Sequence, residues 1–348
     1  MAAAIPRGLL MLVGGVISDR FPPNIIVASA GAASTLLSGS LTLLLLVSDF
    51  HLNGVILISG LFGLSEAFLY PATLALLPRI IRKSRLAQAN AWMQGSEQIS
   101  NVLGPALAGA AIGVFGLTTA FAVNTALFAL GAGCIYLVRT RQPIIAAPSL
   151  EPLTLIHEMW DGWRYASQHA VIRISLLVIA MINFAILGPI VVGVAELVTS
   201  RLGGDASTFG YLQSAYGVGA LFGVWIAGRL EVIKQLQTPL VLLATSLGMG
   251  LIALGFVSHI WSTATIIFAM GIGGGIVGVL ALTWLQQQTA LSMQGRMMSL
   301  VMFAAVALDP FSQAISGVLL EMSLTGLFVA AGITMLFTAF IGYSRKLA

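Results

Sequence analysis

The stretch MLVGGVISDRFPPN, residues 11–24, places the chain in its fold class. It joins the end of an apolar run to a charged turn at Asp19-Arg20, and two prolines follow. The run, residues 2–18, is about long enough to cross a bilayer as a helix, which needs roughly 17–25 residues. No small-x-small cleavage site accompanies it, so we interpret it as a retained membrane helix and not as a secretion signal.

The composition of the whole chain also indicates a membrane protein. Of 348 residues, 58% are hydrophobic and only 8% are charged, whereas soluble domains have about 45–50% and about 25%. The net charge of +4 does not indicate a nucleic-acid partner, because the basic residues are spread over short loops. The single cysteine, Cys134, excludes an intrachain disulfide and a zinc cluster or redox pair built from cysteines.

Apolar runs of spanning length recur along the chain. The eleven runs cover residues 2–18, 25–47, 53–77, 91–115, 117–138, 174–198, 208–227, 239–257, 262–285, 297–320 and 324–343. We therefore expect an all-α integral membrane protein with eleven transmembrane helices.

The distribution of Lys and Arg predicts the orientation in the membrane. Fourteen of the sixteen lie in one set of alternate loops and helix edges, and the opposite loops hold only Arg201. Cytoplasmic loops carry the excess of Lys and Arg, so we expect that set and the C-terminus to be cytoplasmic. An odd number of spans then puts residue 1 outside. We expect that one helix once preceded it; a true eleven-span protein or a miscounted run is the alternative.

The longest polar stretch, residues 139–173, predicts a linker between two halves. It contains three prolines and then TLIHEMWDGWRYASQH, residues 154–169, in which apolar side chains share one helical face. Such a helix suits the cytoplasmic surface of a membrane. We expect an N-terminal helical bundle over 1–138, the linker over 139–173 and a C-terminal bundle over 174–348.

The charged turn after the first run carries a motif. Gly15, Asp19 and Arg20 match Gly-x-x-x-Asp-Arg, and on this motif the chain resembles the major facilitator superfamily, which has it between helices 2 and 3. Pro22 and Pro23 depart from the family pattern. The resemblance implies a two-bundle transporter of twelve helices whose first helix is missing here, with the three matching residues as a cytoplasmic gate. An ordinary charge pair at a helix end is the alternative.

The fourth run carries a second motif. Gly104, Pro105 and Gly109 match the helix 5 motif of drug:proton antiporters, with Ala108 as a small substitute. A proline frees a backbone carbonyl, and small residues permit close helix packing. The resemblance implies an antiporter hinge, and we expect Gly104 and Pro105 at a tight helix interface. Generic small-residue packing is the alternative.

Two further stretches, residues 61–78 and residues 295–299, look typical of the macrolide-efflux and siderophore-exporter branch of that family. Neither identifies a substrate. A weak internal repeat, in which Gly228-Arg229-Leu230 echoes Asp19-Arg20-Phe21, supports two related halves.

Ionisable side chains inside the runs are candidates for function, because a charge at mid-bilayer costs at least about 2.5–3.5 kcal/mol. Glu66 and Glu97 lie at similar depth on consecutive runs, and burial and mutual repulsion would favour protonation of one if they face each other. Asp309 lies in the second half. All three are candidates for proton coupling, with a packed, hydrogen-bonded carboxylate as the alternative. Arg7 is a candidate for substrate binding or a charge pair, or it extends to the outer interface.

No motif predicts a catalytic reaction. The Gly-x-Gly-x-x-Gly match at residues 273–278 lies inside an apolar run, which indicates helix packing, and no phosphate-binding Gly-x4-Gly-Lys-Ser/Thr is present. We therefore expect no enzyme activity, no cofactor and no metal.

The resemblance implies a monomeric secondary transporter in the prokaryotic cell membrane. It would export amphipathic small molecules (drugs, macrolides or siderophore-like compounds) in exchange for protons by alternating access, an activity of the multidrug-resistance type. Its partners would be the substrate, protons and the lipid bilayer, and no nucleic acid. The alternatives are an uncoupled facilitator or importer of a small solute, and a non-functional fragment of a transporter.

Overall fold

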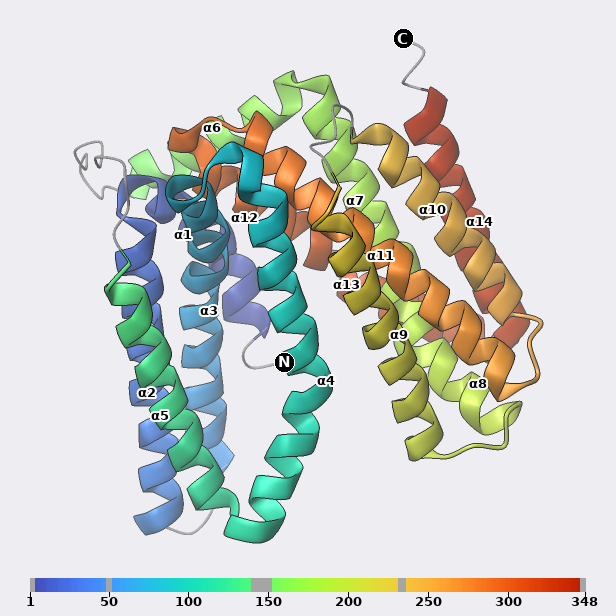
Figure 1. Ribbon diagram of the computed structural model, residues 1–348, viewed down its shortest axis with the longest axis horizontal. Helices are drawn as coiled ribbons and strands as arrows, with labels where there is room; N and C mark the ends of the chain where they lie inside the picture. The colour runs from blue at the N-terminus through green and yellow to red at the C-terminus, as the bar shows by residue number, and fades with distance from the viewer. Residues whose placement is uncertain (1–3, 48–51, 139–151, 231–235, 345–348) are drawn as a thin grey trace. The chain divides into compact units, whose positions relative to one another are not determined.

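The computed structural model describes residues 4–47, 52–138, 152–230 and 236–344, and in these ranges all regular structure is helical (Figure 1). Helical segments long and apolar enough to cross a membrane occur along the described chain. There are eight: Pro23–Val47, Asn53–Ile80, Leu117–Tyr136, Ala170–Ser200, Gln237–Leu254, Ile260–Gln288, Leu291–Met322 and Leu324–Tyr343. The expected all-helical membrane fold is thereby confirmed.

The other three expected spans are helices of shorter or more polar sequence. Helix α1 (Ala4–Arg20) has 17 residues. Helices α4 (Leu86–Phe115) and α9 (Ala206–Ala227) include polar side chains such as Gln98 and Gln213. The total of eleven spans therefore stays a prediction.

The chain forms two compact units, of which the first comprises Met1–Lys83, Leu103–Gln168 and Gln286–Phe303. Here α2 (Pro23–Val47) packs along α3 (Leu52–Ile80) and α5 (Leu117–Tyr136), and α1 packs along α3. The backbones of α1 and α3 approach closely at Gly14, where a Cβ would overlap the carbonyl oxygen of Ala67. Small residues at such contacts are common where helices pack in lipid.

The second unit comprises Ser84–Val102, His169–Leu285 and Ala304–Ala348. Helix α10 (Gln237–Leu254) packs along α14 (Leu324–Ser344), and α7 (Ala170–Gly188) contacts α14 and α13 (Asp309–Met322).

Glycines also bring α9 and α11 (Ile260–Gln288) together in the second unit. A Cβ at Gly275 would overlap the carbonyl oxygen of Ala220, and one at Gly223 would overlap that of Ile272. The glycine-rich match at 273–278 thus serves helix packing, as predicted.

Two spanning segments are interrupted. Helix α7 passes through a π-helical turn, η2 (Pro189–Gly193), into α8 (Val194–Ser200). The hydroxyl of Ser312 inserts there: it donates to the carbonyl oxygen of Phe184 at 2.5 Å and accepts from the N–H of Gly188 at 2.8 Å. A side chain that enters the backbone ladder in this way is a known cause of helix bending. The second interruption separates α12 (Gln294–Val306) from α13.

The helix expected over residues 154–169 is confirmed as α6 (Pro152–Gln168), which packs against α1. Gly162 and Ala166 are buried, whereas Trp160 and Trp163 are 64% and 54% exposed. Residues 139–151 of the expected linker lie outside the described residues.

Candidate functional site

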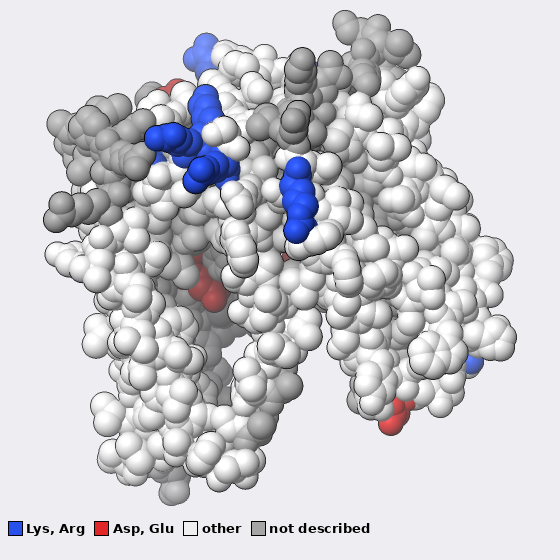
Figure 2. Space-filling view, viewed as in Figure 1, with Lys and Arg blue, Asp and Glu red and all other residues white. Residues whose placement is uncertain are grey.

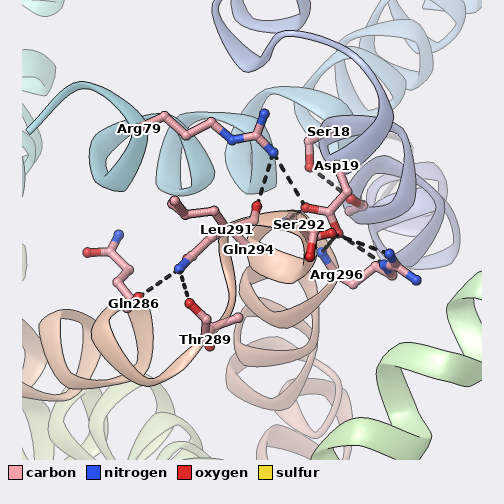
Figure 3. A network of polar contacts seen from close by, with 11 residues as sticks. Ser18, Asp19, Arg79, Gln286, Thr289, Leu291, Ser292, Gln294 and Arg296 are labelled. Carbon is pink, nitrogen blue, oxygen red and sulfur yellow. Dashed lines mark hydrogen bonds and ion pairs between the residues drawn. The ribbon is translucent and has the colours of Figure 1, made fainter. Parts of the chain in front are cut away.

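The charged end of α1 forms the candidate site. The Ser18 hydroxyl donates to the carbonyl oxygen of Gly15 at 2.9 Å within the last turn of α1. The next helix, α2, begins at Pro23, a residue suited to a first helical position because its missing N–H needs no partner there. This short turn leaves Asp19 at the end of α1, directed toward α12 (Figure 3).

The carboxylate of Asp19 binds the first turn of α12. Its Oδ1 accepts from the N–H of Gly295 at 2.6 Å, and its Oδ2 accepts from the N–H of Arg296 at 3.1 Å and from the Arg296 Nε at 3.0 Å (Figure 3). The first N–H groups of a helix lack partners within it and carry partial positive charge. Asp19 therefore caps α12 and neutralises Arg296 at once. We call this set of bonds the α1–α12 contact.

Two glycines allow the α1–α12 contact to form. A Cβ at Gly295 would overlap the Ser18 hydroxyl and the carbonyl oxygen of Gly15, and a Cβ at Gly15 would overlap the Ser299 hydroxyl. Because a larger residue at either position would push the helices apart, Gly15 and Gly295 set the distance at which Asp19 reaches the helix start.

Further polar side chains tie α3 to the segment that leads into α12. Arg79 Nη2 donates to the carbonyl oxygen of Leu291 at 3.3 Å and lies 3.9 Å from Asp19 Oδ1. Gln286, at the end of α11, donates from Nε2 to the carbonyl oxygen of Leu74 at 2.9 Å. Residues 286–296 are thus held by the first half of the chain through hydrogen bonds and charge.

Burial raises the pKa of the Asp19 carboxyl from 3.8 to about 6. The N–H donors of Gly295 and Arg296 and the positive charge of Arg296 act in the opposite direction, but desolvation is the larger effect. The Asp19 side chain is only 3% exposed. The contact therefore holds a carboxylate that titrates near neutral pH.

All three residues of the predicted gate motif lie at or next to this contact. Gly15 and Asp19 take part in it directly, and Arg20, the last residue of α1, is buried with 6% exposure.

The three candidate carboxylates occupy different environments. Glu66 is half-buried on α3 in the first unit. Glu97 is exposed on α4 and Asp309 is half-buried in the first turn of α13, and both belong to the second unit. The side chain of Arg7 lies outside the described residues.

The tight packing predicted at Gly104 finds no partner among the described residues. No described atom lies within 4 Å of a Cβ built there. The nearby side chains of Leu103 and Leu107 on α4 are 51% and 66% exposed. Ala108 is exposed, and the side chain of Pro105 and the surroundings of Gly109 lie outside the described residues. A small residue in a membrane helix indicates where packing is possible, and none of the described residues packs against Gly104.

Sequence reasoning missed the partners of Asp19. Residues 295–299 stood out only as a stretch typical of one branch of the family, and nothing in the spacing connects Arg296 with Asp19. Arg79 and Gln286 gave no signal beyond being polar residues near helix ends.

The chain belongs to the Major Facilitator Superfamily, whose family model matches residues 1–308. It is accordingly a multi-pass membrane transporter and not an enzyme. The expectation drawn from the motif at Gly15, Asp19 and Arg20 is confirmed at the level of the family.

Relatives within that family are distant. The chain is 28% identical over 343 residues to the uncharacterized MFS-type transporter y4rN of Sinorhizobium fredii, covering 97% of this chain and 83% of the relative. It is 24% identical over 318 residues to the enterobactin exporter EntS of Escherichia coli, covering 88% and 72%. A bacterial homologue of the iron transporter ferroportin, solved in an outward-facing state, shares the fold with a TM-score of 0.74 at 18% identity, over 99% of this chain and 89% of that one.

Proposed function

We propose that the protein is a proton-coupled secondary transporter that exports amphipathic small molecules from a bacterial cell. Membership of the Major Facilitator Superfamily supports transport. Similarity to the enterobactin exporter supports export and a substrate of the siderophore type. In this proposal the chain crosses the membrane eleven times, acts as a monomer and has its Lys- and Arg-rich end and its C-terminus in the cytoplasm. The two halves, 1–138 and 174–348, are the moving bundles.

The α1–α12 contact is the observation that carries the mechanism. It joins a helix of the first half of the chain to a helix of the second half, and its bonds are a carboxylate to backbone N–H groups and to one guanidinium. Polar bonds of this kind can be exchanged for bonds to water when the helices separate. Alternating access requires contacts that form on one side of the membrane while the other side is open. The α1–α12 contact is the cytoplasmic one.

Proton coupling is assigned to carboxylates of the spanning segments. Glu66 is the principal proton carrier, Glu97 tunes it, and Asp309 acts from the second half of the chain. Asp309 lies in the first turn of a helix that starts within a spanning segment, where partial positive charge favours an anion. Arg7 binds an anionic part of the substrate or pairs with a carboxylate, and the segment of α4 with Gly104, Pro105, Ala108 and Gly109 acts as the hinge.

The test is substrate accumulation in everted membrane vesicles with an acid interior. A lipophilic cationic dye, a macrolide and a catecholate siderophore are supplied outside, and accumulation is measured with and without a protonophore. We expect accumulation of at least one compound, loss of accumulation with the protonophore, and at least a tenfold lower rate in Asp19→Asn. Transport at a rate that does not depend on the pH gradient would support an uncoupled facilitator instead. Vesicles that move none of the compounds would exclude this substrate class.

A further inference from the structure

The second compact unit contains a groove between α4 and α9. The groove encloses about 500 Å³. Ala91 and Val224 form its buried floor, and Leu221 and Ile99 extend its apolar wall. The two helices come closest at Gly228, where a Cβ would meet the Cβ of Ala91 at 2.9 Å. The groove is therefore closed at the end where α9 finishes and lined with apolar groups.

Aromatic and cationic groups line the groove near that closed end. Trp92 and Trp225 line it and are 73% and 58% exposed. The guanidinium of Arg229 lies 3.5 Å from the centre of the Trp225 ring. No Asp or Glu is among the described lining residues, and no described carboxylate lies within salt-bridge distance of Arg229. The groove thus has a positive group that no described anion neutralises.

In the topology proposed above, on which this inference rests, these groups lie at the cytoplasmic ends of α4 and α9, at the level where headgroups meet hydrocarbon. Trp92 is six residues from the start of α4, roughly 9 Å along a helix. Trp225 lies in the last turn of α9, and Arg229 follows two residues after its end. Tryptophans gather at this level of a bilayer, and cations there meet lipid phosphates. Figure 2, in which α4 and α9 face the viewer as in Figure 1, shows an almost uncharged surface along both helices.

We propose that this groove, which we call the α4–α9 groove, binds one anionic phospholipid of the surrounding bilayer. The phosphate accepts hydrogen bonds from the Arg229 guanidinium, and one acyl chain lies along the apolar wall between the helices. Gln88 and Ser96, which also line the groove, supply hydrogen bonds to the glycerol and ester oxygens.

The stacking of Arg229 on Trp225 explains why the site takes a phosphate. A guanidinium that lies on an indole face keeps its N–H groups directed outward in its own plane, where they can donate two parallel bonds to one anion. A lysine at the same place would supply charge without this fork. Among the described lining residues no carboxylate would repel a negatively charged headgroup, and a zwitterionic headgroup, which carries a positive charge of its own, gains less from the Arg229 guanidinium.

The test uses the full-length protein in detergent, titrated with palmitoyl-oleoyl phosphatidylglycerol and, separately, with the matching phosphatidylcholine. Native mass spectrometry gives the dissociation constant of the first lipid bound. We expect phosphatidylglycerol to bind more tightly, and Arg229→Gln to weaken it about tenfold, as expected when a charge-assisted pair of hydrogen bonds is lost. The affinity of Arg229→Lys for phosphatidylglycerol should lie between those of the unaltered protein and Arg229→Gln. Trp225→Leu should also weaken binding.

Two matched variants control for general effects. Arg82→Gln removes an exposed charge that is not in the groove lining, and Trp261→Leu removes a tryptophan that is 82% exposed outside it. Both should bind phosphatidylglycerol as the unaltered protein does. Three results would overturn the proposal. The two lipids could bind equally tightly, Arg229→Gln could bind phosphatidylglycerol normally, or Arg82→Gln could lose as much affinity for it as Arg229→Gln. Competition between a transported dye and the first lipid would show that the groove is a substrate site instead. None of these readouts depends on transport activity.

Discussion

Asp19 and Arg296 lie 277 positions apart and are joined twice: Oδ2 of Asp19 accepts from Nε of Arg296 at 3.0 Å and from its backbone N–H at 3.1 Å. The other carboxylate oxygen takes the N–H of Gly295 at 2.6 Å. One carboxylate therefore stabilises both a side-chain charge and a helix start. The two contributions can be separated by mutation.

A charge swap should not restore the α1–α12 contact. In the double variant Asp19→Arg with Arg296→Asp, an ion pair can form again, but a cation then faces the N–H groups of Gly295 and residue 296, which repel it. We expect the double variant to transport as slowly as Asp19→Asn, at most a tenth of the normal rate in the vesicle assay. Arg82→Gln should transport normally. Recovery in the double variant would mean that the ion pair alone matters.

The α1–α12 contact should strengthen in acid. The pKa of Asp19 is about 6 in the contact because burial raises it from 3.8, so the contact takes up a proton when it forms between these two values. The pH-dependent contribution of Asp19 to the stability of the contact is greatest below about pH 4 and is lost as the pH rises through 6.

Spin labels on cysteines at Arg82 and Ser292, both exposed, report this equilibrium after the exposed Cys134 is replaced by serine. Pulsed dipolar spectroscopy measures the distance between the two labels. The population with the shorter distance, in which the contact is formed, should grow as the pH falls from 7.5 to 5. Asp19→Asn should abolish the dependence on pH. A population that shifts the other way, or shifts equally in Asp19→Asn, would rule out Asp19 as the titrating group.

Two glycines should respond in opposite ways to alanine. At Gly295 the added methyl group meets Ser18 and the Gly15 carbonyl, so Gly295→Ala should separate α1 from α12 and lower transport severely. At Gly104 it meets no described atom, and alanine is favoured over glycine in a helix by about 1 kcal/mol, so Gly104→Ala should be at least as stable as the original. Melting temperature in detergent and transport rate measure both variants. A strong defect in Gly104→Ala with full activity in Gly295→Ala would contradict the packing described for α4 and α12.

Ser312 should stabilise the π-helical turn. Ser312→Ala leaves the N–H of Gly188 and the carbonyl of Phe184 without the hydroxyl they share, a loss of about 1–3 kcal/mol for a buried group. The melting temperature should fall. Ser40→Ala removes an exposed hydroxyl whose described bond, to the carbonyl oxygen of Leu36, lies within its own helix, and it should change the melting temperature little. Equal melting temperatures for the two variants would show that the turn does not need Ser312.

Proton coupling should depend most on Glu66. Glutamine at this position resembles the protonated carboxyl, so Glu66→Gln should abolish pH-driven accumulation and still bind substrate. Asp309→Asn and Glu97→Gln should retain part of the accumulation. The assay is the everted-vesicle measurement, with substrate binding measured separately on purified protein. Normal pumping by Glu66→Gln together with none by Asp309→Asn would place the proton site in the second half.

The helices could be predicted from the sequence because each follows from local properties. Long apolar runs must satisfy their backbone hydrogen bonds internally in lipid, which leaves the helix as the simplest solution. Helix α6 could likewise be predicted, because the spacing of its apolar residues is a property of that segment alone. The family was recognisable from Gly15, Asp19 and Arg20, since these three stand within six positions of one another. The sequence therefore predicts the α1 side of the candidate gate but not its partners on α12.

What the residues along one helix could not show is which residues of another helix they meet. In an apolar run every face is hydrophobic, so periodicity does not distinguish a packed face from one exposed to lipid. The packing expected at Gly104 accordingly has no partner among the described residues. Asp19 meets Arg296 across 277 positions, and Ser312 enters α7 across 124 from Gly188. Each of these contacts depends on where whole helices lie in space, and only the packed structure brings their backbone N–H groups within reach of a distant side chain.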